Sequence, residues 1–123
     1  MERTPIFLIL DADPEVTAAL ALALRRPGRH IVTCHDAEAA EILLERLPIA
    51  VAISAARLGS PFGFEGLDFV RFVRNRAPGA AVFVMSGSGE RAVEREALRR
   101  GATAILRKPV AARSLERALA EVS

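Results

Sequence analysis

Five short, mostly apolar runs alternate with five segments of helical periodicity along this chain. Each run contains four or five residues, at 6–10, 31–34, 49–53, 81–85 and 103–106. Continuous apolar runs of this length are typical of strands that are buried on both faces. Strict alternation of such strands with helices predicts a doubly wound α/β fold, in which a parallel sheet carries helices on both faces.

The segments between the runs carry helix signals. Asp13 and Pro14 combine an N-cap side chain with a proline at the first helical position, and Asp36 is a second N-cap. Apolar residues at helical spacing predict the inner faces, which are Val16, Leu20 and Leu24; Ile42, Leu43 and Leu47; Leu67, Val70, Phe72 and Val73; and Leu115, Leu119 and Val122. A loop rich in Gly, Ser and Pro is predicted over residues 58–66.

Composition excludes several classes of protein. A chain of 123 residues that is 51% apolar predicts one globular domain over residues 1–123, without an output domain. The single cysteine, Cys34, cannot form an internal disulfide, and we expect it to be a small apolar strand residue. No run reaches the ~20 apolar residues of a membrane span. A net charge of +2 without Trp or Tyr argues against nucleic-acid binding. We therefore expect a cytoplasmic protein that binds neither membranes nor nucleic acid.

Lys108 is the only lysine, since 16 of the 17 basic residues are arginine. Lysine is a compact point charge and does not substitute freely for the planar guanidinium of arginine. Lys108 stands before Pro109, at the end of the last apolar run. Ligands of open parallel sheets bind at the carboxyl ends of the strands. Four strand ends are therefore candidate sites, at residues 11–13, 54–57, 86–88 and 107–109. Three of them carry polar side chains of a recognisable kind, and the end of the third strand, at 54–57, does not.

These strand ends lie in motifs that resemble the receiver domain of bacterial response regulators, a CheY-like fold. The motifs are LILDADP at 8–14, ISAARL at 53–58, FVMSG at 83–87 and GATAILRKP at 101–109. The resemblance implies a three-layer sandwich with five parallel strands in the order 2-1-3-4-5. It also implies a site in which an acidic pair and a third-strand aspartate hold Mg²⁺. That aspartate accepts a phosphoryl group from a histidine kinase, and a Ser or Thr and a lysine contact the group.

The chain keeps only part of this set. Asp11 matches the first acid, Ser86 the hydroxyl residue and Lys108 the lysine, but Ala12 occupies the second acidic position. Asp13 matches a third position that usually lies outside the metal shell, and we expect it to cap the helix. Because Mg²⁺ requires hard oxygen ligands, we predict weak or absent magnesium binding and no other cofactor.

The phosphoacceptor position carries no carboxylate. It aligns with Ala55, or with Ser54 after a slip of one residue, and no acid occurs anywhere in residues 46–64. Alanine cannot accept a phosphoryl group, and a serine hydroxyl is a poor substitute for a carboxylate. Ile105 occupies the position of the family's aromatic switch residue. The resemblance therefore predicts a degenerate receiver that is not an enzyme.

Other polar residues leave alternatives open. Asp11 and Lys108 are expected to pair, unless Lys108 bonds a carbonyl, and Lys108→Met should then change stability by about 1 kcal/mol or less. Arg91, Arg95 and Arg99 recur every four residues among glutamates, which is typical of a solvated face with i,i+4 pairs. The resemblance also implies that partners bind either at this region, which is the fourth helix with the fifth strand and helix, or at the face near the first helix.

Two weaker signals complete the set. His30 and His35 flank the second strand, where we expect loop residues rather than metal ligands. Residues 86–89, Ser-Gly-Ser-Gly, open a helix and could hold an anion on backbone N–H groups.

The first hypothesis for function is a protein-interaction module in two-component signalling that is not switched by aspartate phosphorylation. Its partner would be a histidine kinase, another regulator or a second copy of the chain. A second hypothesis is a phospho-accepting protein that uses Asp11, Asp13 or Ser54. A third is a sensor of small anions or nucleotides that uses residues 86–88 and Lys108.

Overall fold

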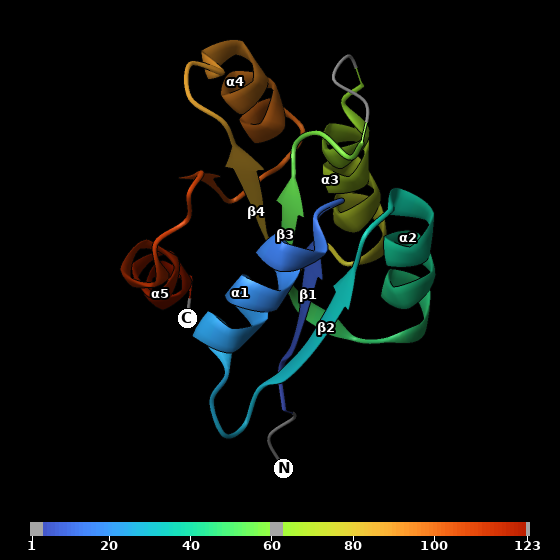
Figure 1. Cartoon of the computed structure of the whole chain (residues 1–123). Coiled ribbons are helices and arrows are strands. Elements are labelled where there is room, and N and C mark those ends of the chain that lie inside the picture. The colour runs from blue at the N-terminus through green and yellow to red at the C-terminus, as the bar shows by residue number, and fades with distance from the viewer. Residues whose placement is uncertain (1–3, 60–62, 123) are drawn as a thin grey trace.

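A five-stranded parallel sheet forms the centre of the computed structural model, which describes residues 4–59 and 63–122 (Figure 1). The strands are β1 (Ile6–Leu10), β2 (His30–Cys34), β3 (Ile49–Ala55), β4 (Ala81–Ser86) and β5 (Ala104–Arg107). Their order in the sheet is β2-β1-β3-β4-β5, and all neighbouring pairs are parallel. The predicted fold class and strand order are therefore confirmed.

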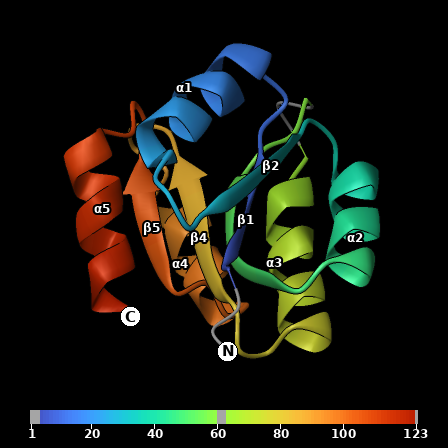
Figure 2. The same ribbon diagram turned by 90° about the horizontal axis from the view of Figure 1, so that it is seen from below.

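Five helices connect the strands and cover both faces of the sheet (Figure 2). They are α1 (Pro14–Leu24), α2 (Ala37–Arg46), α3 (Glu65–Arg76), α4 (Arg91–Arg99) and α5 (Ala112–Glu121). Buried residues of α1 and α5 pack in one apolar cluster, and those of α2, α3 and α4 pack in a second cluster across the sheet. The three-layer sandwich follows from these two clusters.

Successive strand residues belong to opposite clusters. In β1, Phe7 and Ile9 face α1 and α5, whereas Leu8 and Leu10 face α2 and α3. Because side chains alternate across a strand, a strand covered on both sides must be apolar at every position. This explains why the strands appear in the sequence as continuous apolar runs.

The predicted N-caps are confirmed. The side chain of Asp13 accepts a hydrogen bond from the Glu15 N–H at 2.9 Å, and that of Asp36 accepts one from the Ala39 N–H at 2.8 Å. Each cap satisfies a backbone donor that has no partner within its helix. Asp13 therefore aims its carboxylate at the start of α1.

Two predictions of inner faces were wrong. Ile42 is exposed, because α2 turns Ala40 and Leu44 toward the sheet. Val122 is exposed as well, because α5 ends at Glu121 and Val122 is only its C-cap. The helical period was correct in both cases, but the sequence does not define which side of a short helix meets the sheet.

Several boundaries also differ from the predictions. The third strand extends to Ala55, the fourth to Ser86, and the fifth covers Ala104–Arg107. His30 is the first residue of β2 rather than part of a loop. The loop predicted over 58–66 includes residues 60–62, which lie outside the described residues, and it ends at Phe64 because α3 begins at Glu65. Gly66 is therefore helical, and a Cβ at this position would overlap the carbonyl oxygen of Ala55. Only glycine allows α3 to start this close to the end of β3.

Candidate functional site

The carboxyl ends of the strands bring Asp11 and Lys108 together from 97 positions apart in the chain. The Lys108 Nζ lies 2.7 Å from Asp11 Oδ2, so the predicted pairing is confirmed. The other oxygen of Asp11, Oδ1, accepts the Asp13 N–H at 2.9 Å. The Asp11 side chain is only 5% exposed, whereas that of Lys108 is 36% exposed. A buried carboxylate thus depends on an ammonium that remains open to solvent.

Ala55 ends β3 at the same edge of the sheet. It pairs with Met85 across the sheet and is buried. A small pocket of about 170 Å³ lies at this end of the sheet, lined by Ala55, Ala56, Arg57, Met85, Gly87, Glu90 and Lys108. Ala55 and Lys108 therefore line the same cavity.

Ser54, the alternative acceptor position, does not line this pocket. It is fully buried, and its hydroxyl donates to the carbonyl oxygen of Ala55 at 2.9 Å. Its neighbour across the sheet is Leu10 of β1. Because Ser54 is not exposed, a phosphoryl donor cannot reach this oxygen in the folded chain.

Ser86 ends β4, and its hydroxyl bonds to a helix. Ser86 Oγ donates to Glu94 Oε2 of α4 at 2.7 Å. The same carboxylate accepts two hydrogen bonds from Arg107 of β5, from Nε and Nη2, at 3.2 Å each. These hydrogen bonds, from Arg107 first and Ser86 second, lower the pKa of Glu94. Ser86, Glu94 and Arg107 thus link β4, α4 and β5.

Sequence reasoning missed the role of Glu94 and placed it on a solvated face. The buried residues of α4 are Val93, Glu94 and Ala97. The sequence signal for the burial of Glu94 was that it lies beside Val93 on the side of the helix that faces the core. This signal is weak, because most glutamates in such patterns are exposed. The strand partner could not be seen in the sequence at all.

Glu90 and Arg57 form the outer wall of the pocket. Arg57 Nε lies 3.6 Å from Glu90 Oε1, and the Arg57 guanidinium lies 4.6 Å from the centre of the Phe64 ring. The second oxygen of Glu90 is buried and accepts no hydrogen bond within the described residues. Glu90 is also the N-cap residue of α4, without a side-chain capping bond. A carboxylate at this helix end disfavours the anion site predicted for residues 86–89.

The remaining predicted site residues are not gathered at the pocket. Ala12 and Asp13 are exposed, and Asp13 caps α1. Ile105 lies in β5, partly buried against the cluster that contains α4. In residues 4–59 and 63–122, no group of three or more His, Cys, Asp or Glu side chains is close enough to hold a metal ion.

The arginines of α4 point to solvent, as the pattern predicted. Arg91 and Arg95 are exposed, and Arg99 pairs with Glu96 at 3.3 Å in i,i+3 spacing. The i,i+4 pair of this helix is instead Glu96 with Arg100, at 2.8 Å. Whether the three arginines contact a partner stays a prediction.

The fold and the site define the class of protein. A doubly wound sheet has an acid after β1, a hydroxyl residue at the end of β4 and a lysine before a cis proline after β5. This is the arrangement of a signalling receiver module. A family profile described as "Response regulator receiver domain" matches residues 7–120. The chain belongs to this family, whose members act in two-component signalling through contacts with kinases or other regulators.

Curated relatives agree with this assignment. The photosynthetic apparatus regulatory protein RegA of Cereibacter sphaeroides is 30% identical over 112 residues, which cover 91% of this chain and 59% of RegA. The response regulator protein FleR of Pseudomonas aeruginosa is 34% identical over 110 residues, which cover 88% of this chain and 22% of FleR. The chain therefore spans about three fifths or less of these relatives.

Solved structures support the fold. The signal receiver domain of an HD domain-containing protein from Pseudomonas fluorescens superposes with a TM-score of 0.88 at 22% identity, covering 99% of this chain and 88% of that domain. The chemotaxis response regulator CheY4 of Vibrio cholerae superposes with a TM-score of 0.84 at 21% identity, covering 98% and 99%. Among the described residues, no helix is long and apolar enough to cross a bilayer.

Proposed function

We propose that this chain is a degenerate receiver, which acts as a protein-interaction module and is not switched by phosphorylation of an aspartate. The observation that carries the proposal is Ala55, which lines the same pocket as Lys108 and has only a methyl side chain. In the family this position, at the end of the third strand, supplies the acceptor carboxylate. A methyl group has no lone pair with which to attack phosphorus.

The state of the other site residues supports the same proposal. The ammonium of Lys108 is bonded to Asp11, and the hydroxyl of Ser86 is bonded to Glu94. Both groups would have to leave charged partners to meet a phosphoryl group. Hydrogen bonds to charged groups contribute about 1.5–3 kcal/mol each to stability, so breaking these two bonds to contact a phosphoryl group would cost free energy.

The substitute acceptors have less support. Ser54 is fully buried and bonds the carbonyl oxygen of Ala55. Asp11 is buried against Lys108, and Asp13 is committed to the cap of α1. The hypothesis of an anion or nucleotide sensor is weakened by Glu90 at the start of α4.

Incubation with acetyl phosphate and Mg²⁺, followed by intact mass measurement, tests the proposal. We expect the unmodified chain to gain no phosphoryl group. Ala55→Asp restores the acceptor alone, and Ala12→Asp with Ala55→Asp restores both missing carboxylates. The double variant is the matched control, because it shows that the donor can reach the pocket. Phosphoryl incorporation into the unmodified chain would refute the proposal, and peptide mapping would then identify the acceptor.

A binding experiment tests the second part of the proposal, that the chain binds a protein partner independently of phosphorylation. A histidine kinase or another regulator from the same cell should bind equally well with and without acetyl phosphate in the buffer. Titration calorimetry measures both affinities directly. A phosphate-dependent change of tenfold or more would contradict a constitutive module.

A further inference from the structure

The exposed face of α1 carries a pattern that the receiver site does not use. Residues 16–24 contain no charged side chain. The buried residues of α1 are Thr17, Leu20 and Leu24. On the opposite side four residues follow 3-4-3 spacing, which places them in one stripe along the helix. This outer stripe of α1 consists of Glu15, Ala18, Leu22 and Arg25.

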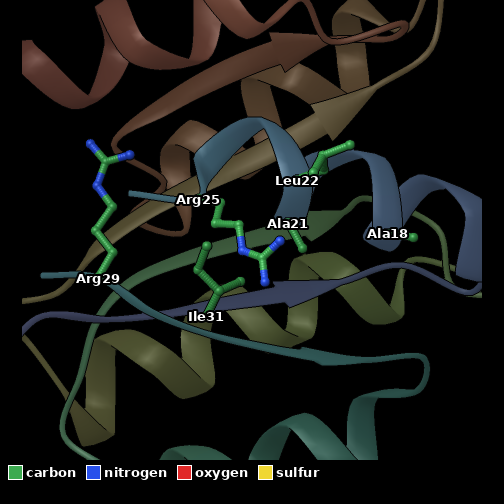
Figure 3. A pocket seen from close by; sticks show the side chains of 6 residues that line it. All are labelled: Ala18, Ala21, Leu22, Arg25, Arg29 and Ile31. Carbon is green, nitrogen blue, oxygen red and sulfur yellow. The ribbon is translucent and has the colours of Figure 1, made fainter. Parts of the chain in front are cut away.

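The centre of the stripe is apolar and open. Leu22 is 69% exposed, the largest value among the exposed large apolar side chains of the described residues. A groove of about 400 Å³ runs between α1 and the edge strand β2, and it is lined by Ala18, Ala21, Leu22, Arg25, Arg29 and Ile31 (Figure 3). A single exposed leucine requires no explanation, but here it borders a groove.

The two ends of the stripe carry opposite charges that form no ion pair with the described part of the chain. Arg29, beside the groove, donates to the Leu24 carbonyl oxygen at 3.0 Å and to both oxygens of Glu116 at 3.0 and 3.2 Å. Arg25 has no ion pair within residues 4–59 and 63–122, and its side chain points in a different direction from that of Arg29 (Figure 3). Glu15 likewise has no ion pair within that part of the chain.

We propose that a second copy of this chain packs its α1 antiparallel against this stripe. Reversing the stripe places Glu15 opposite Arg25 of the second copy and Leu22 opposite Ala18 of the second copy. Two-fold symmetry makes each contact twice. The small side chain of Ala18 leaves room for Leu22, and both charged ends become neutralised.

Other occupants fit the stripe less well. A parallel copy would bring Arg25 against Arg25. An acidic peptide would complement Arg25 but would repel Glu15 at the other end. The stripe is therefore most complementary to the same stripe of a second copy that runs antiparallel to it. An isologous dimer interface requires this self-complementarity.

The expected dimer is weak. An 11-residue helix is about 16 Å long, and a single helix pair buries less than the ~1,200 Å² of a stable interface. Dimerisation should thus depend on concentration. It should also weaken in high salt, because exposed charge pairs are screened over about 8–10 Å.

Sedimentation velocity over a range of concentrations at low salt tests the proposal. Leu22→Asp places a charge in the apolar centre and should raise the dimer dissociation constant at least ~10-fold. The matched control is Leu98→Asp, which changes an exposed leucine of α4 away from the stripe and should leave the constant unchanged. Thermal unfolding followed by circular dichroism confirms that both variants are folded. A wild-type chain that stays monomeric at about millimolar concentration would overturn the proposal, as would equal effects of the two variants.

Charge reversal gives a second, sharper test. Glu15→Arg makes both ends of the stripe basic, and Arg25→Glu makes both ends acidic, so each variant alone should be monomeric. Their equimolar mixture should form a heterodimer, and the double variant should regain self-association. This outcome requires Glu15 and Arg25 to face each other across the interface. A mixture that remains monomeric, or single variants that still dimerise, would contradict the antiparallel arrangement. Neither result depends on the phosphorylation tests above.

Discussion

Replacing Lys108 or Asp11 should have unequal effects on stability, because the two ends of their ion pair are buried to different extents. The carboxylate of Asp11 is 5% exposed and the side chain of Lys108 is 36% exposed. Within residues 4–59 and 63–122, Lys108→Met removes the one cation that is bonded to the Asp11 carboxylate, although Asp11 Oδ1 keeps the N–H of Asp13. Leaving such a group without its partner costs about 1–3 kcal/mol, and we expect about 2 kcal/mol. This exceeds the 1 kcal/mol expected from the sequence, where both ends were assumed to be partly exposed.

Asp11→Asn leaves the other partner in a different situation. Water can hydrate the ammonium of Lys108, and the amide oxygen can still accept the N–H of Asp13. The expected cost is that of an exposed pair, about 1 kcal/mol or less. In the double variant no charge remains buried, so its stability should lie close to that of Asp11→Asn.

Urea unfolding at pH 7, followed by circular dichroism, measures all four proteins of this double-mutant cycle. In thermal unfolding, the same loss should lower the melting temperature of Lys108→Met by roughly 8 °C, at about 4 °C per kcal/mol for a domain of this size. Partner binding should remain intact while the fold is preserved. If Lys108→Met cost no more than Asp11→Asn, the burial argument would be refuted. A selective loss of partner binding would instead show that the lysine contacts the partner.

Further predictions concern the surroundings of the pocket and its metal affinity. Gly66→Ala should destabilise the chain by about 1–3 kcal/mol, since the added methyl overlaps a backbone oxygen of β3; Gly79→Ala meets no atom within 4 Å and should be nearly neutral in urea unfolding. The pKa of Glu94 is lowered from 4.5, so its bonds stabilise the fold above pH 4.5 and this stabilisation is lost as pH falls through the folded-state pKa. Wild type should therefore exceed Glu94→Gln in stability at pH 7, with a difference that narrows in acid; a difference independent of pH would exclude the charge as its cause. Calorimetric titration with Mg²⁺ should show no sub-millimolar affinity. A tighter site would contradict the prediction of weak magnesium binding.

Much of the fold could be predicted because burial on both sides of a parallel sheet forces a local pattern. Each strand is a short apolar run, and Asp13 and Asp36 mark helix starts through bonds that span only two or three residues. The strand order came from the resemblance to receivers rather than from the pattern. The inner faces of α2 and α5 were partly wrong, because packing chooses among similar apolar residues such as Ile42 and Leu44.

The candidate site was predictable where a position in the chain determines a position in space. Residues after β1 and β5 must meet at one edge of the sheet, so Asp11 and Lys108 could be paired from the sequence. Glu94 could not be predicted, because its partners Ser86 and Arg107 come from two different strands. The shielding of the Ser54 hydroxyl by the carbonyl of Ala55 was equally invisible.

The sequence by itself determined the alternation of strands and helices, the presence of an alanine at position 55 and that of a lysine at position 108. These features depend on local periodicity and on which side chains are present. Only the tertiary structure decided how the surviving groups are used, because burial and pairing arise between residues far apart in the chain. The side chain of Asp11 is buried, whereas that of Lys108 is partly exposed to solvent. The hydroxyl of Ser86 donates to Glu94. The physical reason is that the free energy of a charge depends on its solvent and its partner, and the fold sets both.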